Sequence, residues 1–184
     1  MSKSLQGQLL VASPRLTDPN FYHSIVLILQ HDEDGALGLV LNRPLKATMD
    51  QIWKQVGEAP HLNDVPLYCG GPCEGALIVL HQRPDASQGK VLSQVYFSTT
   101  AESVYKLVDE HTAPLLFFAG SSGWSPGQLE AELRAAAWLT LPATSENIFS
   151  PAADPWLSLH RLIAQQRIAP QLKPQAIPDD PRWN

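Results

Sequence analysis

SIVLILQHDEDGALGLVLN, residues 24–42, contains two apolar runs joined by a short polar link. The first run, 24–30, is continuous and rich in β-branched residues, which is typical of a strand buried on both faces. Asp34-Gly35 within the link is a strong hairpin signal, and 36–42 supplies the returning strand. The stretch therefore predicts two antiparallel neighbours within a sheet.

Apolar runs bounded by turn residues predict further strands on both sides of this hairpin. Because some strands are joined by hairpins and helices alternate with strands only in part, the order favours a mixed sheet in an α+β domain. A doubly wound fold is disfavoured, since no G-x-G-x-x-G follows the first strand. The other expected strands cover 5–13, 65–71, 75–81, 91–98, 114–120 and a short edge strand over 140–144, and the expected helices cover 48–57, a segment after Thr99, 128–138 and 156–166.

Capping residues mark the expected helix starts. Thr48 with Gln51, and Thr99 with Glu102, have the spacing of a capping box. Asp154 precedes a proline, and this pair suits the N-cap and the first helical position.

The length of 184 residues suits one domain, which at this size buries about 70% of its unfolded surface. We assign the domain to residues 1–168. The segment 169–184 is rich in proline and lacks apolar periodicity, so it is predicted to be an irregular tail.

The charge balance argues against several classes of partner. The formal net charge is -5, the pI is about 5.6, and no run of Lys or Arg occurs. Nucleic-acid binding and docking on anionic membranes both depend on basic clusters, so neither is expected. Without an apolar stretch long enough for a signal peptide or a membrane span, the protein is expected to be cytoplasmic. Its two cysteines are then not expected to form a structural disulfide.

GWSPG, residues 123–127, matches the G-x-S-x-G pattern of a nucleophile elbow and lies between an expected strand and an expected helix. An elbow uses the backbone N–H of the residue after the nucleophile in its oxyanion hole, but Pro126 has no N–H. We therefore predict that Ser125 is the N-cap of a helix, with Pro126 at its first position and Gln128 at its third. Asp154 and His160 follow in the order of a triad, but such residues are expected downstream by chance.

The same segment is a candidate anion site. Exposed amides and the positive end of a helix dipole can hold a phosphate or carboxylate. Asn42 and Arg43, in NRP at a strand end, carry an amide and a guanidinium that suit such a ligand. We nevertheless favour a structural role for them, in which Asn42 makes turn hydrogen bonds and Arg43 pairs with a nearby acidic residue. The candidate ligand-binding residues are Asn42, Arg43, Gly120, Ser121, Ser122, Gly123, Ser125, Gly127 and Gln128.

No metal or other cofactor is expected. Cys69, Cys73 and His81 lack the fourth ligand of a structural zinc site. DEDG, residues 32–35, is only a truncated calcium-loop pattern. The six histidines show no i, i+4 pair, and whether Asp18, His31, His81 and Arg43 converge is left open. Trp124 is interpreted as a core residue rather than a ligand platform.

Several of these segments occur in order in one known family. GQLLVASPRLTDPNFYHSIVLIL, HDEDGALGLVLNRP, CGGPCEGALIVLH and AGSSGWSPGQLEAEL, with the later Trp138, IF at 148–149 and Trp156, resemble the AlgH/YqgE family. The resemblance covers residues 7 to about 160. Cys73, where a Val-like residue is expected, and the end of the chain after 165 depart from the pattern.

The resemblance implies an α+β fold in which a bifurcated mixed β-sheet curls into a pseudo-barrel flanked by helices. It supplies no catalytic residues, only a historical label as a transcriptional regulator of alginate production. We expect a non-enzymatic binding or regulatory protein that acts through a protein partner or a small anionic ligand. The alternatives are an enzyme acting on a phosphorylated or carboxylated substrate at the 119–125 loop with Arg43, and direct DNA binding.

Overall fold

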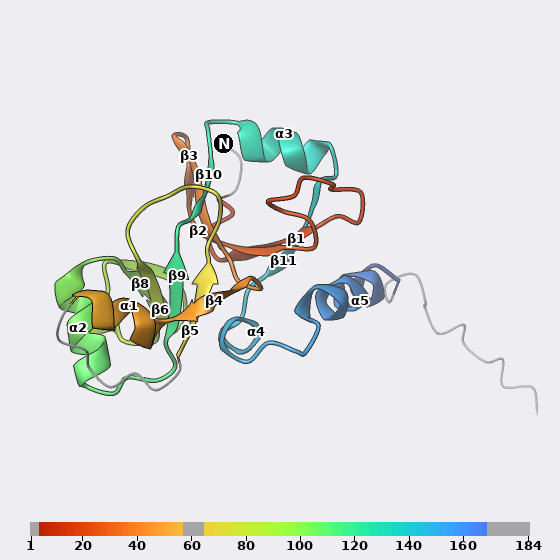
Figure 1. Cartoon of the computed structure of the whole chain (residues 1–184). Helices are drawn as coiled ribbons and strands as arrows, with labels where there is room; N and C mark the ends of the chain where they lie inside the picture. Colours follow the sequence, from red (N-terminus) through yellow and green to blue (C-terminus); the bar gives the residue numbers. More distant parts are fainter. Residues whose placement is uncertain (1–3, 57–64, 169–184) are drawn as a thin grey trace, which may run out of the picture.

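The computed structural model describes residues 4–56 and 65–168 and contains two sheets with helices around them (Figure 1). The five-stranded sheet has the order β10 (Ser122–Trp124), β3 (Gly35–Val40), β2 (Ile25–Asp32), β1 (Gln8–Ala12), β11 (Trp138–Pro142). The six-stranded sheet has the order β4 (Pro44–Thr48), β5 (Pro66–Cys69), β9 (Leu116–Ala119), β6 (Ile78–His81), β8 (Val95–Ser98), β7 (Gly89–Leu92). The helices are α1 (Met49–Val56), α2 (Ala101–Asp109), α3 (Gln128–Arg134), α4 (Ser145–Phe149) and α5 (Pro155–Ile168), with a 3-10 turn over Pro84–Ala86.

The predicted α+β fold with divided, mixed β-structure is confirmed. The five-stranded sheet is antiparallel throughout, whereas β5 and β9 in the other sheet run parallel. Each sheet keeps two edge strands, so the curl does not close into a barrel. In Figure 1, α1 and α2 lie beside the six-stranded sheet, while α3 lies over the opposite end of the molecule.

The β2–β3 hairpin predicted around Asp34-Gly35 is confirmed, with Asp32 opposite Gly35. Alternate residues of β2 enter two different cores. Leu27 and Leu29 belong to the cluster between the sheets, and Val26 and Ile28 to the cluster under α3. This placement explains why the run is continuously apolar, as in other strands covered on both faces.

The two sheets are joined at Gly70, directly after β5. Its carbonyl oxygen accepts from the Val40 amide at 2.8 Å and from the Ser122 hydroxyl at 3.1 Å, both in the other sheet. Its own N–H donates to the carbonyl of Ala119 at 2.8 Å. A Cβ on Gly70 would overlap the carbonyl oxygen of Gly120. The junction therefore requires two backbones to lie closer together than any side chain permits.

Several sequence predictions are wrong in detail. The strand expected over 91–98 is two strands, β7 and β8, because the chain turns at Gln94, whose φ of 60° is left-handed. The strands expected over 65–71 and 75–81 are present as β5 and β6, and β9 lies between them in the sheet. The strands β4 and β10 and the helix α4 were not anticipated.

The capping predictions have mixed outcomes. The helix α2 is capped by Thr100, whose hydroxyl accepts from the Ser103 amide, because Thr99 is bound to Gln88 instead. The Thr48 amide donates to Gln51 at 3.3 Å, which is half of the predicted box. Asp154 caps α5 as predicted, by accepting from the Leu157 amide at 3.0 Å.

The edge strand predicted over 140–144 is confirmed as β11, the last strand of its sheet. The tail predicted over 169–184 lies outside the described residues. In the described part of the chain, no helix is long and apolar enough to cross a membrane.

We expect Gly70→Ala to lower the free energy of unfolding by about 2–3 kcal/mol or more, because the new methyl group meets rigid backbone. Gly75→Ala is the matched control, since a Cβ there meets nothing within 4 Å. Urea unfolding of both variants tests the junction. Equal stabilities for the two variants would show that the Gly70–Gly120 approach is not a constraint.

Candidate functional site

The segment around GWSPG forms part of an aromatic core. Glu132 Oε2 on α3 accepts from the indole N–H groups of Trp124 at 2.9 Å and Trp138 at 2.8 Å, and Oε1 accepts from Gln128 at 3.0 Å. Phe21 stacks on Trp124 and meets the edge of Trp138. The interpretation of Trp124 as a core residue is confirmed, since it is 5% exposed.

The predicted role of Ser125 as the N-cap is wrong. The helix α3 begins at Gln128 and its N-cap is Gly127, with φ 74° and ψ -5°. The Gln128 amide donates to the Ser125 carbonyl at 3.0 Å, so Ser125–Gln128 is a β-turn. Proline at the second position and left-handed glycine at the third are the signature of a type II turn. The Gln128 side chain accepts from the Ser125 amide at 3.0 Å, so only the glutamine half of the capping box forms.

We expect Glu132→Ala to lower the free energy of unfolding by about 2–4 kcal/mol, because it leaves two indole N–H groups at the core without their acceptor. Ser125→Ala is expected to change it by less than about 0.5 kcal/mol, since the serine is exposed and α3 has no side-chain cap. Thermal and urea unfolding measure both variants. A larger loss for Ser125→Ala than for Glu132→Ala would restore the capping prediction.

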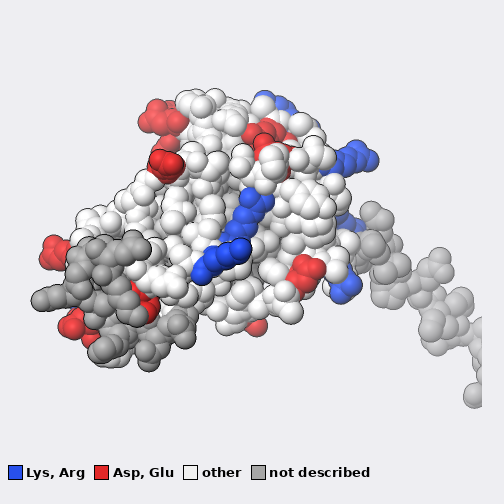
Figure 2. Space-filling view, viewed as in Figure 1, with Lys and Arg blue, Asp and Glu red and all other residues white. Residues whose placement is uncertain are grey.

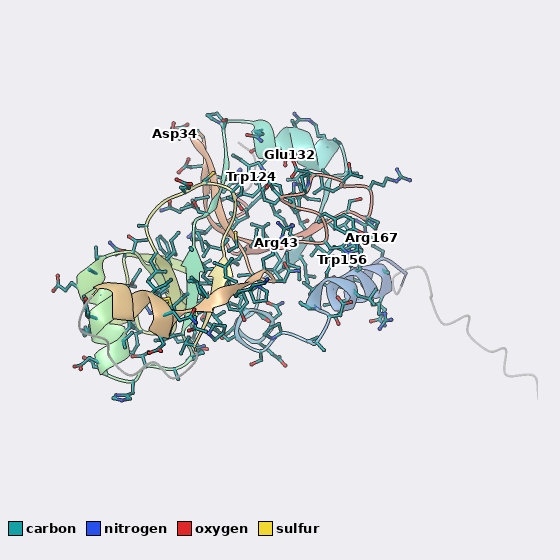
Figure 3. All side chains as sticks on the ribbon, viewed as in Figure 1. Asp34, Arg43, Trp124, Glu132, Trp156 and Arg167 are labelled. Atoms are coloured by element: carbon teal, nitrogen blue, oxygen red, sulfur yellow. The ribbon has the colours of Figure 1, made fainter. Side chains whose placement is uncertain are left out.

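The candidate anion-binding residues do not form one constellation. The strand β10 pairs with β3 from Gly38 towards Ala36, so the chain moves away from Asn42 and Arg43 as it approaches α3. Figure 3 shows Arg43 well apart from Trp124 and Glu132.

Many of the predicted donors near β10 already have partners. The Ser121 amide donates to Cys73 O at 2.9 Å, and the Ser122 hydroxyl is buried against Gly70. A Cβ on Gly120 would lie 2.8 Å from the Cys73 carbonyl, so this glycine packs against backbone. Gly123 and Gly127 are exposed. Anion binding here stays a prediction.

Asn42 and Arg43 hold the loop before β2. Asn42 Oδ1 accepts from the Ile25 amide at 2.9 Å, and its amide group donates to His23 O at 2.9 Å. An Arg43 Nη donates to the carbonyls of Tyr22 at 3.1 Å and Pro19 at 3.3 Å. Both residues therefore have structural partners, as the favoured interpretation expected. The partners of Asn42 lie in the loop before β2 rather than in its own turn, and the hydrogen-bond partners of Arg43 among the described residues are carbonyl groups rather than a carboxylate.

A pocket of about 270 Å³ lies beside Gly120 and is lined by Gly71–Gly75 and Ala119. Its charged lining residue is Glu74, and no Lys, Arg or His lies among the described residues that line it. Figure 2 shows one short stripe of Lys and Arg side chains near the centre of the visible face, whereas most acidic side chains lie near the outline of the molecule. The described lining of this pocket therefore offers no cationic side chain to hold an anion.

His31 and His81 lie in different sheets, on β2 and β6, and each bonds to different neighbours. His31 accepts from the Leu5 amide at 3.0 Å through Nδ1, and its Nε2 lies 3.0 Å from Glu130. His81 accepts from the Arg83 amide at 3.1 Å, which leaves Nε2 as the donor to Ser98 Oγ at 2.9 Å.

The Ser98–His81 pair is not an activated nucleophile. The serine hydroxyl donates to Ala86 O at 2.6 Å, so the imidazole gives a proton to the hydrogen bond instead of accepting one. Burial lowers the pKa of His81, which keeps the ring neutral. Within residues 4–56 and 65–168, no group of three or more His, Cys, Asp or Glu could hold a metal ion.

We expect the lowered pKa of His81 to make the fold less stable in mild acid. Below about pH 6.5 the imidazole binds a proton in the unfolded chain but resists it in the folded one. The contribution of His81 to the free energy of unfolding is therefore fully present above about pH 6.5. It decreases as the pH falls towards the folded-state pKa. His81→Gln removes this contribution. Urea unfolding between pH 5 and 8 should show a flatter profile for the variant, and parallel profiles would contradict the assignment.

A larger groove lies between α4 and α5. Thr144 and Asn147 form a complete capping box that fixes α4, through bonds of 2.8 and 3.2 Å. The helix α5 is held on β1 because Trp156 at 2.8 Å and His160 at 2.9 Å both bond the Ala12 carbonyl. The ring of His23 stacks on Trp156 with a centroid distance of 3.9 Å.

The groove has a volume of about 500 Å³ and a mainly apolar lining. Its one ionisable lining residue, among the described residues, is Glu146. Leu162 borders it and is 39% exposed. The sequence contained a signal for α4 in the Thr144-x-x-Asn147 spacing, but the pairing of α4 with α5 depends on contacts far apart in the chain. The lining residues are Leu141, Pro142, Thr144, Glu146, Asn147, Ser150, Pro151, Ala152, Pro155, Ser158, Leu159, Leu162 and Gln166.

Comparison with known proteins agrees with this architecture. The profile of the AlgH-like family, DUF179, matches residues 9–167. The chain belongs to the AlgH-like family. A UPF0301 protein of Vibrio vulnificus is 34% identical over 185 residues, covering 94% of this chain and 98% of the relative. A UPF0301 protein of Myxococcus xanthus is 37% identical over 150 residues, covering 79% and 83%.

Two solved structures share the fold. The solution structure of the AlgH protein from Pseudomonas aeruginosa has a TM-score of 0.73 and 28% identity, and the match covers 94% of this chain and 96% of that one. A crystal structure of a Corynebacterium diphtheriae protein has a TM-score of 0.70, with 88% of each chain covered. At 21% identity, this second likeness concerns the fold alone. The family resemblance expected from the sequence is thus confirmed, while the family has no established biochemical activity.

Proposed function

We propose that this AlgH-like protein is a non-catalytic binding protein, and that the α4–α5 groove receives an extended segment of a partner protein. The observation that carries the proposal is the groove itself. Its volume of about 500 Å³ lies within the range of binding sites, and its walls combine leucine and proline with a few hydrogen-bonding groups. Any regulatory role would then operate through protein contacts rather than through DNA.

The walls of the groove are firmly held, which favours binding without large rearrangement. Leu159 and Ile163 of α5 are buried in the core between the sheets, together with Ile148 of α4. A preformed site loses less conformational entropy on binding than a flexible one. The single carboxylate of Glu146 favours a neutral or basic segment over an acidic one.

The small-anion alternative has weaker support. Its predicted residues are divided between two places, and several of the predicted donors already bond to protein groups. The Arg43 guanidinium bonds two carbonyl groups of its own loop. We therefore favour the groove over the 119–128 segment.

The chain offers a matched pair of variants for testing the groove. Leu157 and Leu162 lie on the same helix and are 38% and 39% exposed, but only Leu162 lines the groove. Peptides are selected from a random display library on the full chain, and their affinities are measured by fluorescence polarisation. We expect Leu162→Glu to weaken binding at least tenfold, and Leu157→Glu to change it less than twofold.

Three results would count against the proposal. These are peptides that bind the two variants equally, peptides that lose affinity only with Leu157→Glu, and a selection that yields no peptide. The far-ultraviolet circular dichroism of both variants verifies that α5 remains folded.

A further inference from the structure

The helix α5 presents one continuous face to the groove. The lining residues Pro155, Ser158, Leu159, Leu162 and Gln166 recur at intervals of three and four, which is one side of a helix. This stripe extends from the first to the last turn of α5, about 16 Å at 1.5 Å per residue. Two residues after Gln166 the helix ends at Ile168, and the chain continues with residues 169–184.

We infer that the segment 169–178 of the same chain turns back along α5 and occupies the groove, in competition with the partner. Reversal of direction takes about four residues, as in a turn. A proline-rich chain advances about 3.1 Å per residue, so the next six residues, 173–178, match the stripe in length. Within residues 173–178, Ile177 carries the large aliphatic side chain.

The chemistry of the segment complements that of the groove. Residues 169–178, APQLKPQAIP, carry one charged side chain, Lys173, and the groove carries one of opposite sign, Glu146. Ile177 suits the aliphatic walls. Prolines restrict the free segment, so it loses less entropy on docking than a flexible chain would. By contrast, the acidic pair at 179–180 falls beyond the stripe.

The tether makes even a weak contact effective. A short linker gives a local concentration on the order of 1 mM. A segment with an intrinsic Kd of about 0.1 mM would then fill the groove about nine-tenths of the time, and would weaken the apparent affinity of a partner about tenfold. The groove is thereby regulated by its own chain. This inference rests on the proposed function only in taking a partner protein as the ligand with which the segment competes.

The first test detects the contact directly. Ile177 is replaced by the photoreactive p-benzoylphenylalanine in the full chain, which is irradiated at low micromolar concentration and digested for mass spectrometry. We expect intramolecular cross-links to residues between 141 and 166. Cross-links elsewhere, cross-links only to a second copy, or no cross-links would overturn the inference.

The second test measures competition with a peptide selected as above. In the full chain we expect Ile177→Asp to raise the affinity of the peptide about tenfold, whereas Trp183→Asp, the same change beyond the stripe, should leave it within twofold. Equal effects or no effect of the two changes would overturn the inference.

The two proposals fail in different ways. If peptide binding still depends on Leu162, the groove remains a binding site even when the tail variants have no effect. If binding does not depend on Leu162, the proposed function fails, while the cross-links at Ile177 still decide whether the segment occupies the groove.

Discussion

The close approach of two backbones at Gly70 and Gly120 is the constraint on which the rest of the structure depends. Here the chain leaves β5 and β9 of one sheet, and the Gly70 carbonyl accepts hydrogen bonds from Val40 and Ser122 of the other. A single added carbon at Gly70 would occupy the space of the Gly120 carbonyl. The sheets therefore share hydrogen bonds as well as a hydrophobic interface, and their relative orientation is fixed at this point.

This constraint explains why glycine-rich sequence here does not form an open loop. In AGSSGW the sequence suggested free amides before a helix, but the structure uses this segment to cross between sheets. Gly120 packs against the carbonyl of Cys73, and β10 pairs with β3. Glycines that permit close packing and glycines that bind a ligand look alike in a sequence, because both are selected for the absence of a side chain.

Local features were predictable and long-range ones were not. The β2–β3 hairpin and the Asp154 cap depend on residues near one another in the chain, and both were predicted correctly. The burial of Trp124 was also predicted, from the size and apolar character of its side chain, although its partner Phe21 is distant in the chain. The position of β9 between β5 and β6 depends on pairings across about 40–50 residues, which no local pattern specifies. The groove was missed for the same reason: its walls meet because Trp156 and His160 reach back to Ala12.

The arrangement of β9 has a consequence for how the molecule loses its structure. Phe117 lies in the core beneath α2 and its neighbour Phe118 in the core between the sheets, and both are inaccessible to solvent. Because its side chains fill both cores, the strand cannot leave the sheet without opening both. Amide protons on either side of β9 should therefore exchange with deuterium as one cooperative unit, although they belong to separate hydrophobic layers.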